Sequence, residues 1–317
     1  MYNITDELKE AVSLLNDRLN DRLKDSRGMS DKDFRGFIEK NIGKIEVVEP
    51  AGEEILKSYE RDGGIVCVDG SVNRVGGANP HYVDFFQGLA KSTKVKEGVF
   101  LSSLDSPMLD VDQDYSNPVR KDRLLAELEM KVAIEGIKKL SPKILMMDGS
   151  LLRYRIYSES LWKELKNEAL ERDIILMGLI KDIKTSMIKD VLNAEGGSVD
   201  AYDREMLFGR LSYREMISIF DIRNQEKKKG LSSAFLRSSS DPNVIGIDII
   251  SEQGEFLKEM ASLVLSITPY NSRGVPLFID ITDNEVKIKN SVLRALLETG
   301  LDRRNLEVFI RSERDKR

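Results

Sequence analysis

Two short apolar runs in this chain end in the same three residues. The runs Ile65–Val68 and Ile144–Met147 are each followed by Asp-Gly-Ser, at Asp69–Ser71 and at Asp148–Ser150. A continuous apolar run of this length, closed by turn residues, predicts a strand buried on both faces. Two such strands lying side by side would place two carboxylates at one end of a sheet.

Hydrophobic periodicity up to about residue 195 predicts a meander of strands, followed by strands that alternate with helices. The apolar positions and turn signals place helices at 5–40, 118–140, 158–171 and 182–193, and strands at 64–72, 81–89, 95–104, 144–148 and 174–180. This order indicates an α/β fold with a mixed sheet flanked by helices, and it resembles the ribonuclease H (RNase H)-like order.

The pattern after residue 195 is less regular. It predicts a short helix at 202–207, strands at 216–220 and 244–250 with a polar loop at 223–241 between them, a strand-like run at 276–281, and helices at 254–267 and 286–299.

The composition of the 317 residues, 41% hydrophobic and 32% charged, is typical of a folded globular protein. No apolar stretch approaches the roughly 20 residues that span a bilayer, and the amino terminus lacks the basic and apolar regions of a signal peptide. Cys67 is the only cysteine, which excludes an intrachain disulfide and a cysteine-cluster metal site. We therefore expect a cytoplasmic protein that does not act at a membrane.

The net charge of −5 argues against strong, non-specific DNA binding by the whole surface. It is compatible with a nuclease, because metal ions and a local basic face can offset the acidic total. Arg74, Arg153 and Arg155 follow the two Asp-Gly-Ser turns, where they are candidates for such a face or for ordinary surface arginines.

Asp69 and Asp148 are the first candidates for chemistry. An aspartate at the end of a strand often caps its own turn, and a single Asp-Gly-Ser would favour that interpretation. Two of them, each after a buried strand, would bring like charges together unless a cation lies between them. A divalent metal ion held by carboxylates is typical of phosphoryl-transfer chemistry.

A third carboxylate is expected from the helix that precedes the second of these strands. Glu127 and Glu129 are the candidates, with Glu135 as a further one. Glu127 and Glu129 point about 200° apart on a helix, so only one of them can face the sheet. The apolar pattern of the helix does not choose between them.

Two further segments offer charged side chains. Lys181 follows the predicted strand at 174–180, where it could meet a phosphate oxygen or could be an ordinary surface charge. Asp283 is either a helix cap or the last metal ligand, and Asp280 is the nearby alternative.

Several enzyme classes are excluded by missing motifs. The chain has neither a P-loop nor a Rossmann glycine-rich loop, and Ser71 and Ser150 have no histidine partner at triad spacing. The only histidine is His81, within a predicted strand, and we interpret it as structural. These absences argue against an ATPase, a dehydrogenase and a serine hydrolase.

Taken together, the motifs resemble those of the NurA nuclease family. The resemblance covers about residues 65–290 and rests on 68–71, the helix glutamate followed by 145–151, the Gly-Leu-Ile-Lys-Asp at 178–182, the segments 203–207 and 235–237, and Tyr270, Pro276 and 281–283.

The resemblance implies an RNase H-like domain at 61–300, with an N-terminal helical extension at 1–60, a dimerisation or insert region at about 195–250, and a C-terminal tail at 301–317. It implies a manganese-dependent (Mn²⁺, or Mg²⁺) 5′→3′ exonuclease on single- and double-stranded DNA that also has single-strand endonuclease activity. The implied partners are DNA, a second copy of the chain, and a hexameric HerA-type ATPase, in DNA end resection for recombinational repair.

For the site, the resemblance implies that Asp69, a helix glutamate and Asp148 are metal ligands, and the spacing to Asp148 favours Glu129. Many members carry a histidine in the C-terminal motif, where this chain has Asp283. Asp283 would complete the ligand set, and Lys181 would steady the scissile phosphate.

Two alternatives stay open at this point. The first is a non-catalytic RNase H-like adaptor of an ATPase ring that has lost its metal ions. The second is another RNase H-like nuclease, such as an RNase or a Holliday-junction resolvase.

Overall fold

The computed structural model describes residues 4–109 and 118–310, and the chain divides into two compact units. Unit 1 comprises Met1–Pro50, Ile180–Ile247 and Leu257–Val275, and unit 2 comprises Ala51–Leu179, Asp248–Phe256 and Pro276–Arg317. Strand β9 (Ile245–Ile250) begins in unit 1 and ends in unit 2.

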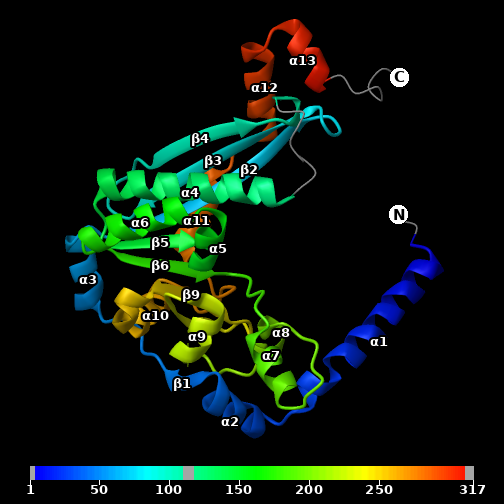
Figure 1. Ribbon diagram of the computed structural model, residues 1–317, viewed down its shortest axis with the longest axis vertical. Helices are drawn as coiled ribbons and strands as arrows, with labels where there is room; N and C mark the ends of the chain where they lie inside the picture. Colours follow the sequence, from blue (N-terminus) through cyan, green and yellow to red (C-terminus); the bar gives the residue numbers. More distant parts are fainter. Residues whose placement is uncertain (1–3, 110–117, 311–317) are drawn as a thin grey trace. The chain divides into compact units, whose positions relative to one another are not determined.

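Unit 2 is built on a mixed sheet in which the strands follow the order β6-β5-β2-β3-β4 (Figure 1). Its strands are β2 (Ile65–Gly76), β3 (Tyr82–Ser92), β4 (Val99–Asp105), β5 (Ile144–Asp148) and β6 (Ile175–Ile180). Strands β2, β3 and β4 form an antiparallel meander, and β5 and β6 run parallel to β2. The predicted RNase H-like mixed sheet is confirmed.

The helices of unit 2 follow the prediction in part. They are α3 (Glu53–Arg61), η1 (Pro107–Leu109), α4 (Pro118–Leu140), α5 (Leu151–Tyr157), α6 (Glu159–Glu171), η2 (Ser251–Phe256), α11 (Leu277–Val286), α12 (Asn290–Gly300) and α13 (Arg303–Ile310). Helix α4 begins and ends where the sequence predicts.

Helices α4 and α11 cover opposite faces of the β2–β3 pair (Figure 1). Gly70 and Gly88 are partners in the β2–β3 register, and a Cβ atom at either would meet side chains of α4. The next pair, Ser71 and Gln87, points the other way, because successive side chains alternate between the faces of a sheet. Both donate hydrogen bonds to the Val286 carbonyl of α11, over 2.8 and 3.1 Å.

The last two helices pack on the outer half of the β2–β3 hairpin. Val83 and Phe85 of β3 form a small buried cluster with Leu293 and Leu297 of α12. Helix α13 lies within the predicted C-terminal tail, of which residues 311–317 fall outside the described part of the chain.

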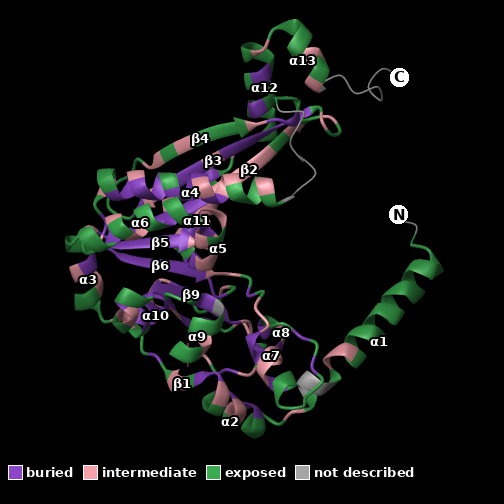
Figure 2. Ribbon diagram, viewed as in Figure 1, coloured by how far each residue is buried: buried purple, intermediate pink, exposed green. Residues whose placement is uncertain are grey.

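Unit 1 contains a small antiparallel sheet in the order β1-β7-β8, formed by β1 (Gly43–Val47), β7 (Glu215–Ile219) and β8 (Leu231–Leu236). Its helices are α1 (Asp6–Gly28), α2 (Asp31–Asn41), α7 (Met187–Ala194), α8 (Asp203–Leu207), α9 (Asp221–Lys228) and α10 (Leu257–Ser266). Its core joins Phe34 and Ile38 of α2, Ile188 of α7, Leu207 of α8 and Ile217 of β7. Helix α1 is exposed over most of its length (Figure 2).

Three predictions of secondary structure were wrong. The helix expected at 5–40 is two helices, because Ser30 caps α2 through a hydrogen bond from the Asp33 amide. The polar loop expected at 223–241 contains α9 and β8. The strand-like run at 276–281 is the start of α11, which buries Ile279, Thr282 and Val286 at helical spacing.

No helix in the described ranges combines the length and the apolar character needed to cross a membrane.

A substitution at Gly178 of β6 tests how closely the second Asp-Gly-Ser turn packs on the sheet. A Cβ atom there would collide with the Gly149 carbonyl oxygen and lie 3.1 Å from the Leu151 amide nitrogen, and backbone atoms cannot rotate away. We expect Gly178→Ala to lower the free energy of unfolding by about 1–3 kcal/mol, measured by urea denaturation. The control is Gly36→Ala in α2, where nothing lies within 4 Å of the new Cβ. Equal stability of the two variants would contradict this packing.

Candidate active site

The register of two parallel strands brings Asp69 and Asp148 together. Val68 of β2 pairs with Met147 of β5, and each aspartate is the next residue on its strand. Neighbouring strands lie about 4.8 Å apart, so the two aspartates leave the same end of the sheet side by side. Asp69 is 7% exposed, and its Oδ1 accepts a hydrogen bond of 2.8 Å from the Gly70 amide.

The turn after Asp148 is fixed by its own glycine and serine. Gly149 adopts a φ of +129°, which a residue with a side chain rarely tolerates. Ser150 caps α5 by accepting a hydrogen bond of 3.3 Å from the Leu152 amide, and its hydroxyl donates one of 2.6 Å to Asp248 Oδ2. The turn therefore passes directly from β5 into α5.

Helix α4 presents Glu129, and not Glu127, to the sheet. The Glu129 side chain is 2% exposed and lies against Gly70, where a Cβ atom would come within 2.7 Å of its Oε1. Only a glycine after Asp69 leaves room for this carboxylate. Glu127 is more exposed and lies 3.9 Å from Arg123 Nε as an i,i+4 ion pair on the helix surface.

Helix α5 supplies the groups that face Glu129. Arg153 Nη1 lies 2.9 Å from Glu129 Oε2 as an ion pair. Within the described part of the chain, Glu129 Oε2 accepts no hydrogen bond in addition to this ion pair. The fully buried Tyr154 hydrogen-bonds to Glu129, and its hydroxyl lies 3.4 Å from the Asp148 carbonyl oxygen.

Burial is the main influence on the ionisation of Glu129. Loss of solvent raises the pKa of its carboxyl to about 7, against the lowering effects of the Arg153 charge and the Tyr154 hydrogen bond. The negative charge of Asp148 raises this pKa further. Asp148 and Glu129 therefore interact electrostatically. Burial is also the main reason why the pKa of Tyr154 lies well above its usual value.

Sequence analysis missed Asp248, which is fully buried within β9 and accepts the Ser150 hydrogen bond. The signal was present, because Asp248 is the only charged residue in the run Ile245–Ile250. A charge is rarely fully buried unless it has a specific partner.

Two further candidates, Lys181 and Asp283, lie on other segments of the chain. Lys181 follows β6 and belongs to unit 1. Asp283 lies on α11, half-buried, with its Oδ2 2.5 Å from Lys287 Nζ, and Asp280 lies one turn earlier. The roles of Lys181 and Asp283 stay predictions.

Arg74, a candidate for binding the DNA backbone, has partners within unit 2. Its guanidinium makes two hydrogen bonds of 2.8 Å to the buried carboxylate of Asp84, and its Cζ lies 3.5 Å from the centre of the Tyr82 ring. A bidentate pair of this kind orients the guanidinium, so Arg74 braces the β2–β3 hairpin.

The cluster has the donor chemistry of a site for a hard divalent cation. The neighbouring elements β2, α4 and β5 each supply one carboxylate, and the described residues that face Glu129 include one cation, Arg153. Oxygen ligands are the ones that Mg²⁺ and Mn²⁺ prefer. As the side chains stand, no three His, Cys, Asp or Glu residues of 4–109 and 118–310 lie close enough to form a ready-made ion site.

The burial of Glu129 predicts a specific dependence of stability on pH. Its pKa of about 7 exceeds the ordinary 4.5, so the folded chain holds this proton more tightly than the unfolded chain does. Stability from this group is complete below pH 4.5 and is lost as pH rises to 7. With a chelator present, the free energy of unfolding should fall by about 3 kcal/mol over that interval relative to Glu129→Gln.

The matched control is Glu127→Gln on the exposed side of the same helix, which should keep the wild-type pH dependence. Urea denaturation at pH 4.5, 6 and 8 measures all three proteins. A Glu129→Gln profile that parallels the wild type would contradict the burial of this carboxylate.

A model of the NurA domain matches residues 63–288, well over half of the chain. A crystal structure of NurA with manganese is 13% identical, with a TM-score of 0.56, and the match covers 93% of this chain and 99% of that one. A crystal structure of NurA bound to dAMP and manganese is also 13% identical, with a TM-score of 0.54 and coverage of 95% and 99%. At this identity the likeness shows a shared fold. No curated protein sequence matches the chain. The chain therefore belongs to the NurA domain family of nucleases and is a phosphodiester hydrolase.

Proposed function

We propose that this chain is a metal-dependent deoxyribonuclease whose divalent ion is held by Asp69, Glu129 and Asp148. The observation that carries the proposal is that Glu129 is buried against Gly70, the residue after Asp69, and is influenced by the charge of Asp148 on the neighbouring strand. Family membership and the donor chemistry both support a metal site. The three carboxylates would draw in around the ion, because a cation offsets both the burial of the Glu129 charge and its repulsion by Asp148, which together raise the pKa of Glu129.

The ion we propose is Mn²⁺ or Mg²⁺, and the substrate is DNA. Support comes from the two NurA structures of the same fold, one with manganese and one bound to dAMP and manganese. When bound, such an ion lowers the pKa of a coordinated water and stabilises charge on a phosphate oxygen.

The protein side chains have separate tasks in this proposal. Tyr154 and Arg153 hold Glu129 in place from one side, and the Gly70 backbone limits it from the other. Asp283 completes the ligand set, and Lys181 binds the scissile phosphate through its ammonium group.

The finer activity that we propose follows the family. It is 5′→3′ exonuclease cleavage of single- and double-stranded DNA, with endonuclease cleavage of single strands, in end resection for recombinational repair. A homodimer and a hexameric HerA-type ATPase are the partners that we propose with it.

Neutral replacements at the two aspartates test the site. We expect Asp69→Asn and Asp148→Asn to lower Mn²⁺-dependent cleavage of DNA by more than about a hundredfold, because each amide removes a charge that holds the ion. Calorimetric titration with Mn²⁺ should show weaker binding for both, with thermal unfolding close to the wild type. Glu127→Gln is the control and should cleave normally.

Two results would contradict the proposal. Normal cleavage by either variant would remove the assigned ligands. A wild-type chain that neither binds Mn²⁺ nor cleaves DNA would favour the non-catalytic adaptor, and a panel of RNA hybrids and junctions would reveal a different nuclease substrate.

A further inference from the structure

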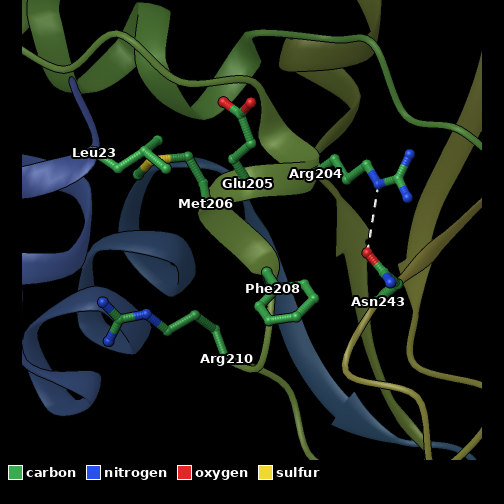
Figure 3. A pocket seen from close by; sticks show the side chains of 7 residues that line it. All are labelled: Leu23, Arg204, Glu205, Met206, Phe208, Arg210 and Asn243. Carbon is green, nitrogen blue, oxygen red and sulfur yellow. Dashed lines mark hydrogen bonds between the residues drawn. The ribbon is translucent and has the colours of Figure 1, made fainter. Parts of the chain in front are cut away.

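Unit 1 contains a hollow whose lining residues lie in other parts of the sequence than Asp69, Glu129 and Asp148. Its chemistry differs from that of these three acidic residues. The hollow encloses about 510 Å³ and is lined by Leu23, Arg204, Glu205, Met206, Phe208, Arg210 and Asn243 (Figure 3). This volume is within the range of small-ligand sites in proteins. The lining includes Arg204, Glu205 and Met206 of the 203–207 segment.

The aromatic ring of Phe208 is exposed to solvent. It is 55% exposed, although it follows the buried Leu207 directly. Gly209 has a φ of +71° and its amide donates a hydrogen bond of 3.0 Å to the Pro242 carbonyl, while the Arg210 amide donates to the Leu207 carbonyl over 3.0 Å. This anchored turn keeps the Phe208 ring at the surface of the hollow.

Arg204 and Arg210 lie on opposite sides of Phe208 and point away from each other (Figure 3). Arg204 pairs with Asp182, and its Nε lies 3.4 Å from Asn243 Oδ1. Arg210 pairs with Asp31. The Arg204–Asp182 pair is exposed on both sides, at 46% and 64%, and such pairs contribute little, so a phosphate can take the place of Asp182. Arg210 is 15% exposed and its Cζ lies 5.2 Å from the centre of the Phe34 ring, so its guanidinium is held in place.

The one carboxylate in the lining is already engaged. Glu205 accepts a hydrogen bond of 2.9 Å from the Tyr202 amide and lies 3.4 Å from Arg22 Nη2. In the close view its carboxylate points away from the Phe208 ring (Figure 3). The surface around Phe208 is therefore an exposed aromatic ring near one exposed arginine, Arg204.

We propose that this hollow binds single-stranded DNA, with one base stacked on Phe208 and a backbone phosphate at Arg204. Exposed aromatic rings flanked by cations are the usual means of holding a single strand without reading its sequence. The choice of DNA as the strand rests on the proposed function.

The test is fluorescence anisotropy with a fluorescein-labelled 20-nucleotide dT strand and the full chain, in EDTA so that nothing is cleaved. We expect Phe208→Ala to weaken binding about tenfold and Phe208→Trp to retain it, because stacking needs a flat ring. Replacing Arg204 with Ala should reduce the slope of log affinity against log salt by about 0.7, for the one lost phosphate contact.

Phe100→Ala and Arg303→Ala are the matched controls, since both residues are exposed and lie in unit 2. Thermal unfolding confirms that each variant is folded. The proposal is overturned if Phe208→Ala binds the strand as tightly as Phe100→Ala does. It is also overturned if Phe208→Ala changes only the oligomeric state in sedimentation, which would make the hollow a protein contact.

Failure of the proposed function would look different. A wild-type chain that binds the strand through Phe208 but cleaves nothing with Mn²⁺ would contradict the nuclease proposal and support the one made here.

Discussion

The close seat of α4 on the β2–β3 pair is the constraint on which the candidate site depends. Gly70 and Gly88 remove the side chains that would hold the helix away, and Gly136 of α4 does the same from the helix, where a Cβ would lie 2.7 Å from Ala90. The helix therefore comes close enough to bury Glu129 against Gly70, the residue after Asp69. A larger residue at Gly70 would separate the carboxylates that the proposed chemistry brings together.

Because the Glu129 carboxylate is buried, its negative charge needs a partner nearby. A buried ion pair gives little net stability, but an unpaired buried charge is costly. Arg153 pairs with Glu129 and Tyr154 hydrogen-bonds to it. Both residues belong to α5, the helix that begins at the second Asp-Gly-Ser turn. The turn thus contributes Asp148 as a candidate ligand and also starts the helix that stabilises Glu129.

Sequence reasoning succeeded where the determinants are local. The apolar runs before Asp69 and Asp148 predicted β2 and β5, and their parallel pairing confirmed that the two aspartates share one sheet end. It failed where a pattern is short or polar. The apolar residues of 276–281 fit a strand as well as a helix, and the many charges of α9 hid an element that tertiary packing stabilises.

The rest of the site depends on contacts between distant segments. Helical spacing alone could not choose between Glu127 and Glu129, because the choice depends on which face of α4 meets Gly70. The pairing of Arg153 with Glu129 was invisible because α5 was not predicted. Asp248 was predictable in principle, since a lone charge in an apolar strand requires a partner, and that partner is Ser150.

A crystal of the full chain soaked with Mn²⁺ tests the central claim most directly, because anomalous scattering locates the ion without reference to activity. The account predicts one strong peak within about 2.0–2.6 Å of carboxylate oxygens from Asp69, Glu129 and Asp148. A fully occupied Mn²⁺ elsewhere, with Glu129 still paired to Arg153 and no ion beside the two aspartates, would contradict it.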